Sequence, residues 1–425
     1  MRNRTTETNK IGSVLMAVLA FFAVLGSATF GIRLSTFMLS PFRILLVILL
    51  AAGLFTATAL AFSSEVSMVY KYWVILFLYA CLSVFGVADR GSWLSGVIYL
   101  AIGLLILFLF LRFNGIIDFF PYYRFVTAIM LIIVSVWGWY EMRTGNYIFL
   151  RNAEFLKIYS YADKRCPVVF FGNTNNFALF VSFSLLLLFP MLLDSSIVKK
   201  LLYIGMAVLS FPLIIMSDSR ANVIGLAIGI VVWLVIRMKS RLTLTQMIVI
   251  SAVLIAASIV FVLFWDTISN AINNFFYFTG SKASSSKSNF SRTNLTLNGF
   301  LMILNSAGFG VGCGNSSVPG NHTYNTLGIY DLHDWWLVML SEYGLVFGIA
   351  YFVIYIIQTK RLFDYIREEE NEKHKMTLTS FAAIDIAFVL CLTSPSGVVA
   401  IEWIWVYWGI RYAWVNKYCL KYNSL

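Results

Sequence analysis

The feature that most constrains this chain is a succession of long apolar runs separated by short polar segments. A helix needs about 20 apolar residues to cross a bilayer, and its backbone groups must then be satisfied within the segment. Runs of this kind lie at 11–31, 37–62, 69–88, 93–112, 122–140, 174–193, 199–217, 221–238, 244–265, 335–357, 377–394 and 397–415. The sequence therefore predicts an all-α, polytopic integral membrane bundle of about 12 transmembrane helices, with residues 1–425 forming a single transmembrane domain.

The composition agrees with a membrane protein. Hydrophobic residues make up 60% of the chain and charged residues 12%, against roughly a quarter charged in soluble domains. The net charge of +11 does not indicate nucleic acid as a partner, because the basic residues lie between apolar runs and form no block with interleaved aromatic residues. Membrane orientation and contact with anionic lipid explain this charge better.

The short basic loops predict the orientation of the chain. VKK at 198–200 and RMKSR at 237–241 interrupt the apolar runs, and short basic loops tend to stay in the cytoplasm. An even number of spans puts both termini on one side, so the N- and C-termini are predicted to be cytoplasmic. The first run follows a basic start and lacks a clear cleavage site, so it is interpreted as a membrane helix rather than a signal peptide.

Two segments on the predicted outer side stand apart. Residues 141–166 are basic and aromatic, and residues 266–334 form a loop far longer than a connector requires, which favours a functional role. Within the long loop, 279–295 is polar and predicted to be mobile, and 295–317 is predicted to be a short amphipathic helix ending in a glycine-rich turn. The five cysteines show no paired spacing, and a bridge between Cys166 and Cys313, both on outer loops, stays open.

Three residues of the outer side could carry chemistry. Arg220 lies between two apolar runs with almost no loop around it, Arg292 lies in the long loop, and His333 stands at the head of the next run. Together they would supply two permanent cations and one titratable base at one membrane interface. Each also has a simpler interpretation: Arg220 as an arginine that reaches lipid headgroups, Arg292 as a solvated loop residue, and His333 as an interfacial residue beside a helix cap at Asp334.

Glu342 lies nine positions after His333. At ~100° and ~1.5 Å per residue, the two side chains are on opposite sides of a helix and ~13 Å apart along it, so they must have different roles. A carboxyl group at this depth is predicted to face the bundle interior, paired or protonated, and a tie to a neighbouring helix is the simplest interpretation. Asp385 and Glu402 lie in the last two runs, and an acid-lined ion path would be the transporter interpretation.

Four elements resemble, in order, motifs of the O-antigen ligase and Wzy-type O-antigen polymerase superfamily. They are FGNTNNFALFV at 171–181, SDSRANVIGLAIG at 217–229, the long loop with SRTNLTLNGF and the glycine-rich turn, and LHDWWLVMLSEYGLVFG at 332–348. Two departures bear on substrate choice: Asp334 stands where the family often has Asn, and the turn before Gly310 lacks the usual Pro.

The resemblance implies a GT-C-like fold in a bacterial cytoplasmic membrane and a transfer reaction on its outer face. A glycan joined by diphosphate to a polyprenol would move to an acceptor hydroxyl with inversion, without metal or other cofactor. Arg220 and Arg292 would hold the departing diphosphate, and His333 would take the hydroxyl proton. The expected substrate-binding residues are Arg143, Arg151, Asn173, Asn176, Asp334 and Glu342; for the basic loop of 141–166 a solvated surface is the alternative.

The acceptor separates two versions of this enzyme. A polymerase would use another lipid-linked repeat unit and a ligase would use a lipid A core or a protein; the segment CLTSPSGVVAIEWIWVYWGI at 391–410 resembles the polymerases of surface and capsular polysaccharides, including teichuronic-acid types. Expected partners are the lipid-linked oligosaccharide, the glycan acceptor, membrane lipid and a chain-length regulator. A metal-dependent glycosyltransferase is disfavoured because the first outer loop, GIRLSTFMLS, has no paired acids. A lipid-glycan flippase is the alternative outside enzymes.

Overall fold

A computed structural model describes the chain over residues 2–34, 37–54, 62–113, 119–149, 165–238, 263–268, 270 and 285–422. Its contacts divide the chain into two compact units. The first unit is Met1–Thr127, Ser286–Tyr355 and Gly397–Leu425, and the second is Ala128–Ser285 and Ile356–Ser396. Two of the four boundaries fall well inside helices, one in α5 (Phe120–Thr144) and one in α13 (Trp335–Glu368).

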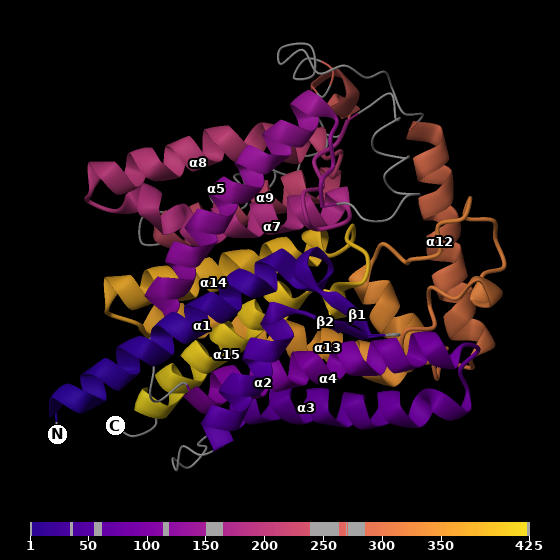
Figure 1. Ribbon diagram of the computed structural model, residues 1–425, viewed down its shortest axis with the longest axis horizontal. Helices are drawn as coiled ribbons and strands as arrows, with labels where there is room; N and C mark the ends of the chain where they lie inside the picture. The colour runs from indigo at the N-terminus through magenta and orange to yellow at the C-terminus, as the bar shows by residue number, and fades with distance from the viewer. Residues whose placement is uncertain are drawn as a thin grey trace. The chain divides into compact units, whose positions relative to one another are not determined.

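The first unit consists of helices and one small hairpin. Its members, besides parts of α5 and α13, are α1 (Arg2–Phe30), β1 (Ile32–Leu34), β2 (Phe37–Leu39), α2 (Pro41–Leu54), α3 (Ser64–Leu82), α4 (Arg90–Phe113), α12 (Ser285–Asn305) and α15 (Glu402–Tyr422), with single 3-10 turns at Ser83–Phe85, Pro319–Asn321 and Val398–Ala400. The strands are antiparallel, with Ile32 opposite Leu39. Helices α3 and α4 lie alongside each other (Figure 1).

Small residues allow α4 and α15 to pack closely. A Cβ atom at Gly103 would lie 2.4 Å from the ring of Trp405, and one at Gly409 would lie 2.8 Å from the ring of Phe110. Trp405 belongs to an aromatic cluster with Trp73, at 4.9 Å between ring centroids. This packing forms the interior of the first unit.

The second unit contains α7 (Thr174–Leu188), a 3-10 turn at Phe189–Leu193, α8 (Ile197–Met216), α9 (Arg220–Met238) and α14 (Glu372–Cys391). Helix α9 packs tightly on α14 because Cβ atoms at Gly225 and Gly229 would lie 3.0 and 3.2 Å from the carbonyl oxygens of Ala387 and Ala383. Helix α7 is the most enclosed of the candidate spans, with 78% of its apolar window buried.

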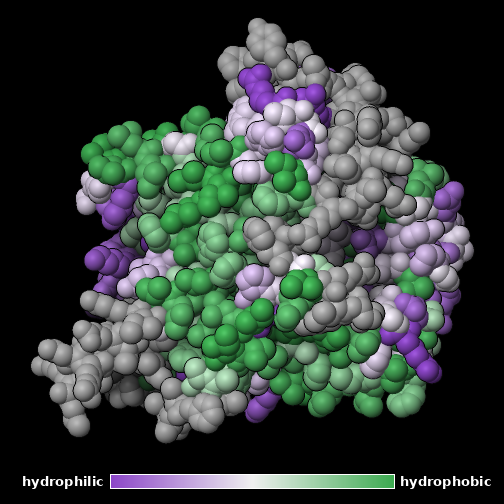
Figure 2. All heavy atoms as spheres, in the orientation of Figure 1, coloured by the Kyte–Doolittle hydropathy of each residue, from purple (hydrophilic) through white to green (hydrophobic). Residues whose placement is uncertain are grey.

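The prediction of an all-α membrane bundle is confirmed. Among the described residues, eight helices are long and apolar enough to cross a membrane, and two shorter apolar helices span Gly12–Gly26 and Pro41–Gly53. The eight are Ser64–Phe85, Arg90–Phe113, Phe120–Thr144, Thr174–Leu193, Ile197–Met216, Arg220–Met238, Trp335–Glu368 and Glu372–Cys391. Hydrophobic side chains also cover the outer surface, for example over α8 and α3 (Figure 2), as expected of helices that face lipid.

Two of the expected runs become helical later than predicted. The run at 37–62 opens with strand β2, and helix α2 starts only at Pro41. Most of the run at 244–265 lies outside the described residues. The last run, expected at 397–415, becomes helical only at Glu402. The reason is local: Gly397 has a left-handed backbone (φ 61°) and is followed by the 3-10 turn of Val398–Ala400.

The long loop is more helical than expected. Helix α12 begins at Ser285, so it includes part of the polar segment expected to be mobile, and Arg292 lies on a helix rather than in irregular chain. The glycine-rich turn that follows is confirmed, with positive φ angles at Gly308, Gly310, Gly312 and Gly314. All five cysteines are free, so no bridge joins Cys166 to Cys313. Cys313 is buried, with its Sγ 3.3 Å from the hydroxyl of Tyr343.

Candidate functional site

Arg220 is the first residue of α9 in the second unit. Helix α8 ends at Met216, and the connecting turn has Asp218 in a left-handed conformation (φ 63°). The guanidinium lies 5.7 Å from the ring of Trp265 and 3.7 Å from Oδ1 of Asp266, and its side chain is 37% exposed. Trp265 in turn donates from Nε1 to Asp218 at 2.7 Å. The turn therefore holds a partly accessible cation at a helix N-terminus.

The N-termini of α7 and α9 lie side by side because a buried asparagine joins them. Nδ2 of Asn222 donates to the carbonyl oxygen of Asn175 at 3.4 Å and to the hydroxyls of Ser219 and Ser394 at 2.8 and 3.0 Å. Ser182 of α7 donates back to the carbonyl oxygen of Asn222 at 3.2 Å. Helix N-termini present N–H groups and a partial positive charge, so two of them beside Arg220 make an environment that suits an anion.

The two asparagines predicted to bind substrate lie at this same end of α7. The side chain of Asn173 caps the helix by accepting from the N–H of Asn175 at 2.7 Å, and its Nδ2 donates to Ser396 at 3.5 Å. Oδ1 of Asn176 is buried and has no hydrogen-bond partner within the described part of the chain. Asn176 therefore retains an acceptor for a donor such as a sugar hydroxyl. Arg220, Asn173 and Asn176 are thus grouped in the second unit.

More than half of the basic loop of residues 141–166 lies outside the described residues. Arg143 is exposed at the end of α5, where its carbonyl oxygen accepts from the guanidinium of Arg165 at 2.7 Å, and Arg151 lies outside the described residues. A residue that was not predicted from the sequence is Glu141, which is fully buried and accepts from the N–H groups of Val168 and Val169 at 2.8 Å each. In the sequence, Glu141 could have been recognised as an acidic residue directly after the apolar run at 122–140.

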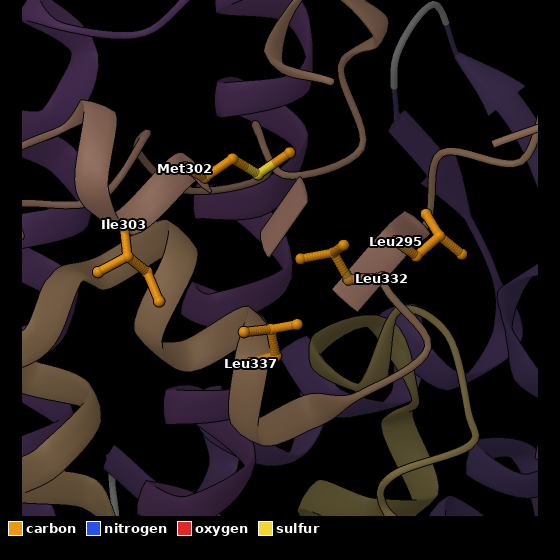
Figure 3. Packing of buried hydrophobic residues seen from close by; sticks show 5 residues of the cluster. All are labelled: Leu295, Met302, Ile303, Leu332 and Leu337. Carbon is orange, nitrogen blue, oxygen red and sulfur yellow. The ribbon is translucent and has the colours of Figure 1, made fainter. Parts of the chain in front are cut away.

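Arg292 and His333 both belong to the first unit and are carried by elements that pack on each other. Leu295, one turn after Arg292, shares a buried cluster with Leu332, the residue before His333 (Figure 3). Leu337 completes this contact by lying against Gly299 of α12, where a Cβ would be 2.5 Å from it. Ser291 also donates to the carbonyl oxygen of Thr326 at 3.0 Å.

Asp334 caps α13. Its Oδ1 accepts from the N–H groups of Trp336 and Leu337 at 2.9 and 3.3 Å, as the cap interpretation requires. Burial raises the pKa of the Asp334 carboxyl above its ordinary value. The cap fixes where α13 begins, and therefore fixes the backbone that carries His333.

Glu342 is 6% exposed and is paired, as expected of a carboxyl group at its depth. Its partner, however, is the glycine-rich turn, and the expected tie to a neighbouring helix is wrong. Glu342 accepts from the N–H of Gly314 at 2.8 Å and from the hydroxyl of Ser316 at 2.6 Å. The turn can approach α13 this closely because Gly310 and Gly344 have no side chain; Cβ atoms there would lie 2.5 Å from carbonyl oxygens of the opposite segment.

A cavity of about 440 Å³ opens beside this turn, entirely within the first unit. Its wall comes from the start of α4, the glycine-rich turn, the residues before α13, α13 itself and the segment before α15. Its charged and hydroxyl-bearing lining residues are Asp89, Ser92, Ser95, Tyr99, Ser316, Ser317, Asp331, Glu342 and Tyr343. Of these, only Glu342 was predicted from sequence, because the others are isolated residues of helices and connecting segments that have no recognisable spacing.

A second histidine, His322, organises the loop around the cavity. Its Nε2 lies 2.8 Å from the carbonyl oxygen of Ser316, and its Nδ1 lies 3.1 Å from Nδ2 of Asn298 on α12. Oδ1 of Asn298 accepts from the N–H groups of Thr323 and Tyr324, so its Nδ2 must be the donor to His322. Within the described part of the chain, no three His, Cys, Asp or Glu side chains gather as metal ligands would.

Comparison with known proteins found a family model and a relative to which this chain is similar. Residues 205–353 match a family model described as O-Antigen ligase, a range that contains Arg220, Arg292, His333 and Glu342 but not Asn173 or Asn176. The chain is also 23% identical over 435 aligned positions to the teichuronic acid biosynthesis protein TuaE of Bacillus subtilis (strain 168). That alignment covers 97% of this chain and 86% of the relative.

Proposed function

We propose that the chain is a member of the O-antigen ligase and polymerase superfamily, and that it joins polyprenyl-diphosphate-linked oligosaccharide repeat units into a surface polysaccharide. The observation that carries the proposal is the position of Arg220 at the N-terminus of α9, beside the N-terminus of α7. A lipid diphosphate that leaves during transfer develops negative charge, and these groups complement it. The relative named for teichuronic acid biosynthesis supports a surface polysaccharide as the product.

In the proposed reaction, the oxygen of an acceptor hydroxyl attacks the anomeric carbon of the lipid-linked glycan. The bond from that carbon to the diphosphate oxygen breaks, the electron pair leaves with the diphosphate, and the anomeric configuration inverts. His333 takes the hydroxyl proton, Arg220 binds the departing diphosphate through its planar guanidinium, and Arg292 adds a second positive charge. In the proposed mechanism the two arginines, and not a metal ion, stabilise the negative charge of the departing diphosphate.

The assignment of the remaining groups follows from their positions. Asn173 and Asn176 would contact the glycan next to the diphosphate, since they share the end of α7 that lies beside α9. Arg143 and Arg151 would add phosphate contacts from the basic loop. We place this reaction on the outer face of a bacterial cytoplasmic membrane with both chain termini inside, because the basic loops at 198–200 and 237–241 favour the cytoplasm.

The test uses the purified full chain in detergent with a lipid-linked repeat unit and follows chain length on a gel. We expect wild type to elongate the glycan and both Arg220→Ala and His333→Ala to lose elongation while remaining folded. Arg237→Ala is the matched control, since Arg237 lies at the other end of α9, half exposed and paired with Glu372. Normal chain length in both site variants would overturn the assignment.

Two further functions are distinguished by related measurements. A ligase would transfer a finished chain to a lipid A core or another acceptor, so a strain lacking this gene would accumulate full-length lipid-linked chains rather than single repeats. A flippase would change nothing covalent in detergent, where no compartments exist. The buried acids give the flippase little support, since Glu342 is bound by the glycine-rich turn and Glu402 pairs with Arg43 at 2.9 Å.

A further inference from the structure

The cavity beside the glycine-rich turn has an acidic lining. Three carboxyl groups line it, those of Asp89, Asp331 and Glu342, and none of the described residues that line it is a lysine or arginine. Arg43 approaches from behind Tyr99, with its Cζ 5.4 Å from the ring centroid, but its charge is matched by Glu402 in a buried ion pair. A diphosphate or a sugar carboxylate would meet repulsion in this cavity.

The rest of the lining suits a sugar ring. Ser92, Ser95 and Ser317 supply hydroxyl groups, Tyr99 adds an aromatic face and a phenol, and Val338 with the Val398–Ala400 turn adds apolar surface. Carboxylates accept two or more hydrogen bonds from hydroxyl donors, which a polyol presents in abundance. The volume of about 440 Å³ also lies within the range of about 300–1,000 Å³ usual for small-molecule sites.

The wall of the cavity is preorganised rather than loose. The N–H of Asp89 donates to Oδ1 of Asn315 at 2.8 Å, and Nδ2 of Asn315 donates to the carbonyl oxygen of Asp89 at 3.1 Å. The side chain of Asp89 also accepts from the N–H of Ser92 at 2.7 Å, and hydrogen bonds from Ser92 lower the pKa of this carboxyl. Gly96 allows α4 to meet the turn, since a Cβ there would lie 2.7 Å from Sγ of Cys313.

We propose that this cavity binds an uncharged or amino-bearing sugar ring of the glycan acceptor and rejects rings that carry a carboxylate or phosphate. The assignment of this ring to the glycan acceptor rests on the proposed function. The class of sugar rests on the cavity itself. It links to the reaction through the chain: Asp331 and Leu332 line the cavity, and His333 is the next residue. A hydroxyl of a ring bound here would be presented near the backbone that carries the proposed base.

The experiment measures binding, which requires no transfer. The full chain in lipid nanodiscs is mixed with methyl glucoside, methyl glucosaminide or methyl glucuronide, and saturation-transfer NMR reports contact with the protein. We expect several-fold stronger signals for the first two probes than for the glucuronide, and the strongest signal for the glucosaminide, whose ammonium form the carboxylates attract. In an Asp89→Asn, Asp331→Asn double variant, the glucosaminide should lose its advantage over the glucoside and the glucuronide signal should rise.

The substitutions preserve shape, since asparagine keeps the acceptor that caps α4. A Glu368→Gln, Glu370→Gln double variant is the matched control, because it removes two negative charges from exposed positions of the second unit that do not line the cavity. A glucuronide signal as strong as the others in wild type, unchanged preferences in the double variant, or no signal from any probe would each overturn the subsite. If the probes bind with the expected preferences but the protein elongates no glycan, the proposed function is wrong and the sugar subsite still stands.

Discussion

The hydroxyl of Ser316 donates to Oε1 of Glu342 at 2.6 Å, so the glycine-rich turn is attached to α13 by a buried carboxyl group. The N–H groups of Gly314 and Ser316 donate to the same side chain at 2.8 and 3.3 Å. One glutamate thus satisfies three donors of a turn that has few side chains of its own. A glutamate within a membrane helix is therefore a structural anchor here, and it lines the proposed sugar subsite as well.

Replacing Glu342 should loosen the turn. In Glu342→Ala, three donors lose their acceptor, two of them buried, at about 1–3 kcal/mol for each buried group left unsatisfied. We expect a lower midpoint of thermal unfolding in detergent and faster proteolysis between Gly308 and His322. Glu342→Gln keeps an acceptor oxygen in place and should lie between Glu342→Ala and wild type. An alanine variant with the wild-type midpoint and cleavage rate would mean that the turn holds its shape without this anchor.

Gly344 should tolerate no side chain. Its backbone (φ 81°, ψ 172°) lies in a region that costs other residues about 1–3 kcal/mol. A Cβ there would also lie 2.5 Å from the carbonyl oxygen of Gly308, which belongs to backbone and cannot rotate away. We expect Gly344→Ala to lower the unfolding midpoint and reduce the yield of folded protein.

The control for this substitution is another glycine in a membrane helix. A Cβ atom added at Gly205 of α8 would have no other atom within 4 Å, so Gly205→Ala should leave stability unchanged or raise it by about 0.5–1 kcal/mol. Equal stability of the two alanine variants would show that the close approach at Gly344 is not required.

The sequence predicts helices far better than it predicts what the loops do. The spans around α4, α8 and α9 follow from apolar runs alone, because a membrane helix satisfies its own backbone. The helical position of Arg292 was not predicted, since a Ser-rich segment has weak intrinsic helix propensity and α12 is stabilised instead by Leu295 and Leu337 packing together. Tertiary contacts of this kind leave no local pattern.

The residues of the candidate site also differ in whether their positions could be predicted from the sequence. Arg220 and Asn173 could be predicted because they stand at helix starts, where the break in an apolar run is visible. Asp89 and Asp331 could not be predicted, since a cavity forms only when the α3–α4 connection meets the glycine-rich turn, and that meeting depends on Gly96 and Asn315.

The proposed role of Arg220 depends on the paired N–H donors of its planar guanidinium group and not on charge alone. A lysine would keep the charge but lose the paired N–H groups that match two phosphate oxygens. We expect Arg220→Lys to reduce chain elongation by on the order of tenfold or more, since charge-assisted bidentate hydrogen bonds are among the strongest. The assay is elongation of a lipid-linked repeat by purified protein, with Arg237→Lys as the control at the far end of α9. Full activity of Arg220→Lys would indicate that a point charge suffices.

His322 should make the folded loop sensitive to acid. Its Nδ1 must be unprotonated to accept from Asn298, and burial lowers the pKa of this imidazole below its ordinary value. The folded state therefore binds the proton less readily than the unfolded chain. The stabilisation is present in full above the ordinary histidine pKa of about 6.5, and it is lost as the pH falls through the lowered value.

We therefore expect the unfolding midpoint of the wild type to fall between pH 7.5 and pH 5. His322→Gln places an amide N–H near the position of Nε2, where it can still donate to the carbonyl oxygen of Ser316, but has no group that titrates in this range, so it should be less stable at pH 7.5 and lose less on acidification. The comparison of interest is the difference between the two pH values in each protein, measured by thermal unfolding in the same detergent. An equal loss in both proteins would assign the acid sensitivity to groups other than His322, and would leave the Asn298 contact as a purely structural one.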